Sequence, residues 1–153
     1  MEILHDGNLF ARVLLALATI GYGVITVKAD FNRTHATNPD WTPHARFHVV
    51  WQITSYVGFG LVAQALIWIP GPYAVERLYL AAAFAAVVYG AFFIALATMS
   101  IYGGSTFDRN GYTPFKVRIG RPRLWDVNVT AFSVMTVFLV AGAVLIGRGG
   151  PIG

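Results

Sequence analysis

Residues 29–52 read ADFNRTHATNPDWTPHARFHVVWQ and lie between two long apolar segments. This stretch holds three of the four histidines of the chain, with two aspartates, two asparagines, two prolines and two tryptophans. A simple connector between two apolar helices needs few of these ligand-capable side chains. The stretch therefore predicts both a break between the first two helices and a connector with a functional role.

The composition is typical of a membrane protein. Hydrophobic residues make up 56% of the 153 residues and charged residues 12%, against roughly 45–50% and 25% in soluble domains. The net charge of +4 comes from basic residues between the apolar segments, so membrane lipid is the expected partner and nucleic acid is not. The chain has no cysteine, which excludes disulfides, thiolate metal sites and cysteine nucleophiles.

Four apolar segments are long enough to cross a hydrocarbon core of about 30 Å as helices. They predict one all-α membrane domain over residues 1–153, built as a bundle of four transmembrane helices. The predicted helices cover residues 9–27, 47–69, 78–101 and 127–146. We expect the two long connectors on one side of the membrane, where they form a polar lid. These are the first connector, residues 28–46, and the second connector, residues 102–125.

Three smaller patterns predict finer detail. Ala82, Ala86 and Gly90 follow at four-residue spacing, which predicts a small-residue face for close helix packing. Gln64 lies inside the second span and predicts a hydrogen bond between helices. The Asn-Gly pair at residues 110–111 predicts the turn of a small β-hairpin.

Lysine and arginine predict the orientation. Eight of the eleven fall in the two connectors and three on the other side. The positive-inside rule then places both connectors in the cytoplasm and both termini outside it. The expected location is a bacterial inner membrane, with the protein as an integral component.

Polar side chains recur at helical spacing at the helix ends that meet the connectors. Residues three, four or seven apart share one face of a helix, and a polar group in hydrocarbon is costly. The pattern predicts a hydrophilic pocket under the lid, against the alternative that these groups cap and solvate the helix ends. The three faces are Tyr22, Thr26 and Asp30; His44, His48, Gln52 and Ser55; and Asp126, Thr130 and Ser133.

Two chemistries fit these residues. His44 and His48 have the i, i+4 spacing at which two imidazoles bind one metal ion. His35 is the predicted third ligand, with Asp30 or Asp126 as alternatives. A divalent metal is thus a candidate cofactor, against a hydrogen-bonded histidine pair that anchors the lid. The second chemistry is metal-free acid/base catalysis, with His48, Asp30 and Asp126 as candidate catalytic residues. The candidate ligand-binding residues are Asn32, Asn38, Trp41, Gln52, Ser55 and Thr130.

The first connector resembles the signature D-x-N-x-T-H-x-x-N-P-x-W-x-P-H-A-x-F-H. The matching residues are Asp30, Asn32, Thr34, His35, Asn38, Pro39, Trp41, Pro43, His44, Ala45, Phe47 and His48. The chain is thereby similar to a family of small four-helix membrane proteins of unknown function from bacteria and fungi. The resemblance implies that this connector is the functional feature of the family. It supplies no activity, cofactor or substrate.

These observations predict a binding or catalytic site at the cytoplasmic boundary of the membrane. It binds a metal or handles protons at the polar end of a lipophilic molecule, which enters from the bilayer. Enzymatic activity is left open, because a non-catalytic subunit of a larger membrane complex, docking through its connectors and small-residue helix faces, also fits. A proton-coupled transporter ranks last, since only Gln64 and Tyr89 lie deep in the spans.

Overall fold

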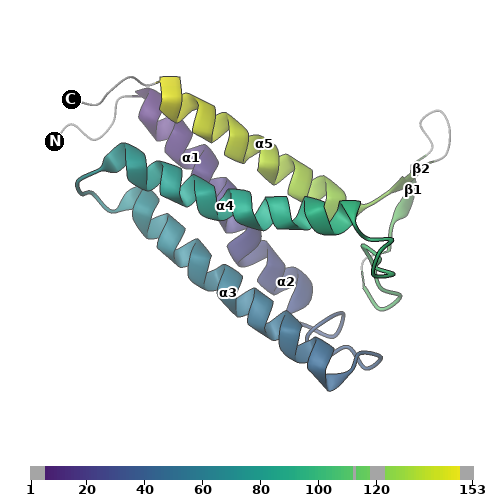
Figure 1. The fold of residues 1–153 in the computed structure, drawn as a ribbon. Coiled ribbons are helices and arrows are strands. Elements are labelled where there is room, and N and C mark those ends of the chain that lie inside the picture. The colour runs from purple at the N-terminus through teal and green to yellow at the C-terminus, as the bar shows by residue number, and fades with distance from the viewer. Residues whose placement is uncertain (1–5, 112, 118–122, 149–153) are drawn as a thin grey trace.

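The computed structural model describes residues 6–111, 113–117 and 123–148, and this part of the chain is mainly helical (Figure 1). Its first three helical elements follow one another without a break, and two short strands precede the last helix. The elements are α1 (Asp6–Ile20), the π-helical turn η1 (Gly21–Ile25), α2 (Thr26–Asp30), α3 (Pro43–Trp68), α4 (Ala74–Ala97), β1 (Phe115–Val117), β2 (Arg123–Trp125) and α5 (Val127–Arg148).

Among the described residues, four helical segments are long and apolar enough to cross a membrane, which confirms the predicted all-helical class with four candidate spans. They are Leu9–Asp30, Pro43–Trp68, Ala74–Ala97 and Val127–Arg148. The second helix starts earlier than the predicted residue 47. The cause is local, because the Thr42 hydroxyl accepts a hydrogen bond from the backbone N–H of Ala45 at 3.2 Å and Pro43 suits the first turn of a helix.

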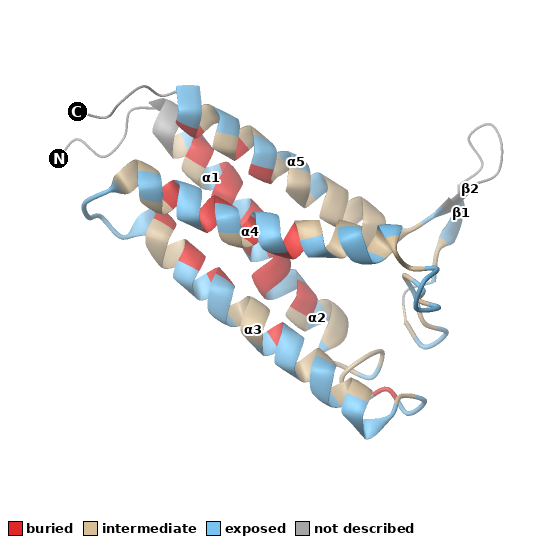
Figure 2. Cartoon of the chain, viewed as in Figure 1, coloured by how far each residue is buried: buried red, intermediate tan, exposed pale blue. Residues whose placement is uncertain are grey.

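The first span is the central helix of the bundle. In its most apolar window 56% of the residues are buried, against 17% in α5. Figure 1 shows α5 beside α1, with α3 against η1 and α2, and α4 packed on both α3 and α5. Figure 2 shows the buried residues along α1 and on the inward sides of the other helices. The outward faces carry exposed apolar side chains, which suits contact with hydrocarbon.

A short chain of polar contacts runs between two helices of the bundle. The Gln64 side-chain amide donates to the hydroxyl of Thr19 at 2.7 Å and to the carbonyl of Ala16 at 3.2 Å. The indole N–H of Trp68 donates to the Gln64 carbonyl oxygen at 3.0 Å. The predicted hydrogen bond between helices is therefore confirmed, and it joins α1 to α3.

The π-helical turn η1 interrupts the first span near its middle. A wider turn displaces backbone groups from their usual i, i+4 partners, and two side chains bind carbonyls at this place. The Thr26 hydroxyl donates to the carbonyl of Tyr22 at 2.5 Å. The Tyr89 hydroxyl, from α4, donates to the carbonyl of Ala18. Two side chains thus supply hydrogen bonds to backbone carbonyls at the irregular turn.

The predicted small-residue face of α4 does not pack inward as a whole. Ala81, Ala82 and Ala85 are buried, but Ala86 is exposed. A Cβ added at Gly90 would meet no atom within 4 Å. Large residues on the same helix, Leu78 and Tyr89 among them, are buried and set its rotation.

The predicted hairpin turn at the Asn-Gly pair is wrong. The strands pair Phe115 with Trp125, so the Asn-Gly pair lies before both of them. The Asp108 carboxylate instead accepts a hydrogen bond from the backbone N–H of Asn110 at 2.8 Å. The backbone carbonyl of Asp108 accepts one from the backbone N–H of Gly111 at 2.9 Å. This local turn, an Asx-turn, uses the same residue types that favour hairpins.

Candidate functional site

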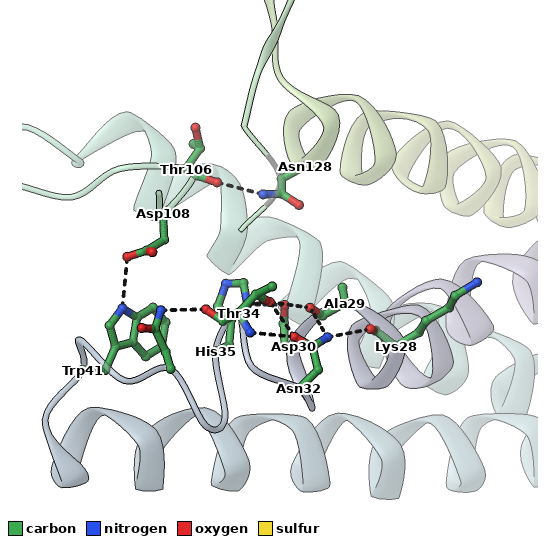
Figure 3. Close-up of polar contacts among 11 residues, drawn as sticks. Lys28, Ala29, Asp30, Asn32, Thr34, His35, Trp41, Thr106, Asp108 and Asn128 are labelled. Atoms are coloured by element: carbon green, nitrogen blue, oxygen red, sulfur yellow. Dashed lines mark hydrogen bonds and ion pairs between the residues drawn. The ribbon is translucent and has the colours of Figure 1, made fainter. Parts of the chain in front are cut away.

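The first connector is shaped by its own side chains, beginning with Asn32 (Figure 3). The Asn32 amide donates to the carbonyls of Lys28 and Ala29, both at 2.9 Å. These carbonyls lie in the last turn of α2, where helical partners are missing. The Asn32 oxygen accepts the backbone N–H and the hydroxyl of Thr34, at 2.8 Å and 2.7 Å. Asn32 therefore ends α2 and turns the chain back on it.

Asn38 holds the second half of the loop. Its side chain is fully buried. The amide donates to the Thr34 carbonyl at 2.8 Å, and the oxygen accepts the backbone N–H of Asp40 at 3.0 Å. A buried amide with both ends bonded fixes one loop conformation, because breaking either bond leaves a polar group unpaired.

The turn brings His35 back onto Asp30. His35 Nδ1 lies 3.5 Å from Asp30 Oδ1 and 2.7 Å from the Thr34 hydroxyl. The Thr34 hydroxyl has one proton and two other acceptors, Asn32 Oδ1 at 2.7 Å and the Ala29 carbonyl at 3.1 Å. The network therefore assigns the His35 proton to Nδ1, which donates to Thr34 and faces the carboxylate. Nε2 is left as the acceptor.

The second connector docks on the first through polar groups. Arg109 pairs with Asp40, with Nη2 2.7 Å and Nε 3.0 Å from Oδ2, and the Asn110 amide donates to the same oxygen at 2.6 Å. The Trp41 indole N–H donates to Asp108 Oδ2 at 3.2 Å. Figure 3 shows the Trp41 to Asp108 contact bridging the two connectors.

The docked connectors shift the pKa of three side chains. The hydrogen bond from Arg109 holds the pKa of Asp40 below its ordinary value, and the same contact raises the pKa of Arg109. The backbone N–H of Asn110, followed by the Trp41 indole, lowers the pKa of Asp108. Each shift favours the charged form because each partner stabilises it.

His44 and His48 form a second, separate cluster on the exposed side of α3. Their Nε2 atoms are 3.0 Å apart, and their rings meet edge to face with centroids 4.5 Å apart. The His48 ring also stacks on Trp51 and contacts the edge of Phe47, each with centroids 5.9 Å apart. These aromatic contacts limit the positions that the His48 ring can take.

The three predicted metal ligands are thus divided between two clusters. Over the described residues, no three His, Asp or Glu side chains lie close enough together to hold a metal ion. Asp30 also does not contact His48, although the acid/base hypothesis included both residues as candidates. Asp30 contacts His35, and His48 contacts His44. The turn made by Asn32 causes this, because it folds His35 onto the end of α2.

Asp126 and Thr130 make the contacts of a helix cap. Asp126 Oδ1 accepts the backbone N–H of Val129 at 3.0 Å, and Oδ2 accepts the Thr106 hydroxyl. The Thr130 hydroxyl donates to the Asp126 carbonyl at 2.8 Å. These contacts match the capping alternative for the start of α5.

The remaining candidates lie further along α3 and in the loop. The exposed Gln52 amide donates to the Tyr56 hydroxyl at 3.1 Å, and Ser55 is half-buried. The Trp41 ring meets the His35 ring edge to face, with centroids 5.2 Å apart. Trp41 is therefore the predicted ligand-binding residue that lies directly against the Asp30–His35 pair.

Sequence reasoning missed two parts of this site. Thr34 was read only as part of the signature, although it orients His35. The contacts of Asp40 with the second connector were also missed. The available signal was the run of Asp108, Arg109 and Asn110, whose charged and amide groups complement the first connector.

Comparison with known proteins gives a family but no activity. The model of a family described as a family of unknown function (DUF6640) matches residues 14–119, which is more than half of the chain. No curated protein and no solved structure matches. The match includes the whole first connector and most of the second.

Proposed function

We propose, from the premise that the chain belongs to the family of unknown function DUF6640, that its first connector handles protons at the membrane boundary. The substrate class is a lipophilic molecule with a polar end. His35 acts as the acid/base and Asp30 orients it. The signature from Asp30 to His48 is then the functional feature of the family.

The observation that carries this proposal is the geometry of Asp30, Thr34 and His35. With Nδ1 directed at Thr34 and Asp30, Nε2 accepts a proton from a substrate, and the carboxylate stabilises the imidazolium that forms. The side chains of His35 and Asp30 are 26% and 29% exposed. They are therefore open to a substrate but partly screened from water, which strengthens their electrostatic interaction.

The position of the pair supports a lipophilic substrate. Asp30 is the last residue of the first candidate span, and His35 follows in the connector. A polar group held at this level meets the reactive nitrogen while its apolar tail stays among the helices. The charge distribution favours the cytoplasmic face of a bacterial inner membrane for this site.

The test uses the protein in vesicles made from the total lipid extract of its host, suspended in heavy water. We expect a lipid species that is converted, or that gains deuterium at carbon, in a mass spectrum. General acid/base catalysis contributes about 10²–10⁴-fold. Asp30→Asn and His35→Asn are therefore expected to lower the rate about 10²-fold or more, while Thr37→Ala, on an exposed neighbour, is expected to leave it unchanged.

A second candidate function is a non-catalytic subunit of a membrane complex. Two small residues on α4 favour it, because they allow another helix to approach closely. Ala86 is exposed, and a Cβ added at the half-buried Gly90 would meet nothing within 4 Å. Absence of any lipid change, together with a partner that co-purifies with the wild type and is lost in Gly90→Leu, would support this candidate over proton handling.

A further inference from the structure

The His44–His48 cluster has the spacing of a chelating pair. Two ligand nitrogens, each about 2.0–2.1 Å from one metal ion and roughly 90–110° apart around it, are separated by about 2.9–3.4 Å. The two Nε2 atoms are 3.0 Å apart. We infer that His44 and His48 bind one divalent transition-metal ion on the outer side of α3, separately from the Asp30–His35 pair.

The pair is held ready for a metal by the helix that carries it. Thr42 and Pro43 fix the first turn of α3, so the backbone under both histidines is ordered. Phe47 and Trp51 contact the His48 ring. Little side-chain freedom remains to be lost at His48 when an ion binds, and preorganisation of this kind favours binding.

The ligand chemistry selects the class of ion. Imidazole nitrogen suits Zn²⁺, Cu²⁺ and Ni²⁺, while Mg²⁺ and Ca²⁺ prefer oxygen ligands. Both histidines are exposed, and among the described side chains no third His, Asp or Glu joins them. The chain therefore supplies two ligands, and water completes the coordination of an exchangeable ion.

The site is independent of the proposed proton chemistry. His35 Nδ1 is engaged by Thr34 and Asp30, and nothing in the metal geometry uses it. His35→Ala therefore serves as a matched control: it removes a histidine of the same signature without touching the chelating pair.

The experiment is a calorimetric titration of the full chain in detergent with Zn²⁺ alone, and with Mg²⁺ for comparison. We expect one Zn²⁺ per chain and no binding of Mg²⁺. His44→Gln and His48→Gln are each expected to weaken Zn²⁺ binding by tenfold or more, and His35→Ala to leave it unchanged. Helical circular dichroism verifies that each variant is folded.

Two further measurements separate this site from general surface binding. X-ray absorption is expected to show two imidazole nitrogens at about 2.0–2.1 Å from zinc. Zn²⁺ is expected to raise the unfolding temperature of the wild type and not that of His48→Gln, because a ligand of the folded state stabilises it. The inference is overturned by the absence of saturable binding, by full binding in His48→Gln, or by four imidazoles per ion, which would mean that two chains share it.

Discussion

Single residues of the first connector divide into those that shape the loop and those that remain for chemistry. Asn32 ends α2, Asn38 is buried with both ends of its amide bonded, and Trp41 bonds to Asp108. These three were predicted to bind a ligand, and their side chains make contacts within the protein. The signature histidines remain as candidates for chemistry: His44 and His48 are exposed, and His35 is half-buried beside Asp30.

At the residue scale, the contact of Asp40 with Arg109 predicts how docking of the two connectors depends on pH. Its pKa is held below the ordinary value of 3.8 by the hydrogen bond from Arg109. A carboxylate with a lowered pKa in the folded state stabilises that state above its ordinary pKa, and the contribution is lost as the pH falls through the lowered pKa. Connector docking is therefore expected to be constant from neutral pH to about pH 4 and to weaken below it.

The measurement is the fluorescence of Trp41, taken as the difference between the wild type and Trp41→Phe. Asp40→Asn is expected to change this signal already at neutral pH and to flatten its dependence on acid. High salt should act in the same direction, because the ion pair with Arg109 is exposed and screened. An acid transition that is identical in Asp40→Asn would show that Asp40 does not control docking.

At the scale of helices and strands, the sequence predicts well which segments are helical. It predicts poorly which face of each helix packs inward. Hydropathy identifies the four candidate spans because a run of about twenty mainly apolar residues is typical of a transmembrane helix. The face that α4 turns inward could not be read in the same way, since alanine and glycine occur on several of its faces. Leu78 and Tyr89 decide it, and their partners lie on other helices.

A pair of glycines on α3 tests the packing of that helix. A Cβ at Gly60 would lie 3.3 Å from the Cα of Gly23, whereas a Cβ at Gly58 would meet nothing within 4 Å. Gly60→Ala is expected to destabilise the fold by about 1–3 kcal/mol through overpacking. Gly58→Ala is expected to stabilise it by up to about 1 kcal/mol, because alanine favours helix.

Reversible unfolding in mixed detergent micelles measures both glycine variants under one condition. The two substitutions add the same methyl group to the same helix, so their difference isolates the contact between α3 and η1. Equal effects of the two would mean that Gly23 and Gly60 do not approach closely.

At the scale of the whole molecule, the prediction concerns which side of the membrane the two connectors face. The chain has no cysteine, so a single introduced cysteine reports its own side of the membrane. In spheroplasts, Pro72→Cys in the exposed turn between α3 and α4 is expected to react with a membrane-impermeant maleimide. Thr113→Cys in the second connector is expected to react only after the membrane is opened. The reverse pattern would place the connectors outside.

The sequence indicates which connector holds the candidate site, but not which of its side chains contact one another. Histidines, asparagines and aspartates concentrated in one connector indicate where the chemistry lies. Their pairing depends on the direction in which Asn32 turns the chain, and on which face of α3 carries His44 and His48. Both depend on contacts in the folded chain, so the sequence alone did not indicate that Asp30 pairs with His35.

The packing of α5 along α1 also has a consequence for biogenesis. A Cβ at Gly142 would lie 3.0 Å from the side chain of Leu15, so the last helix fits tightly on the first. Among the described helices, α1 is made first and α5 last. The face of α1 that α5 covers therefore has no partner on α5 until α5 has been made. The α1–α5 contact is therefore among the last to form as the chain is made.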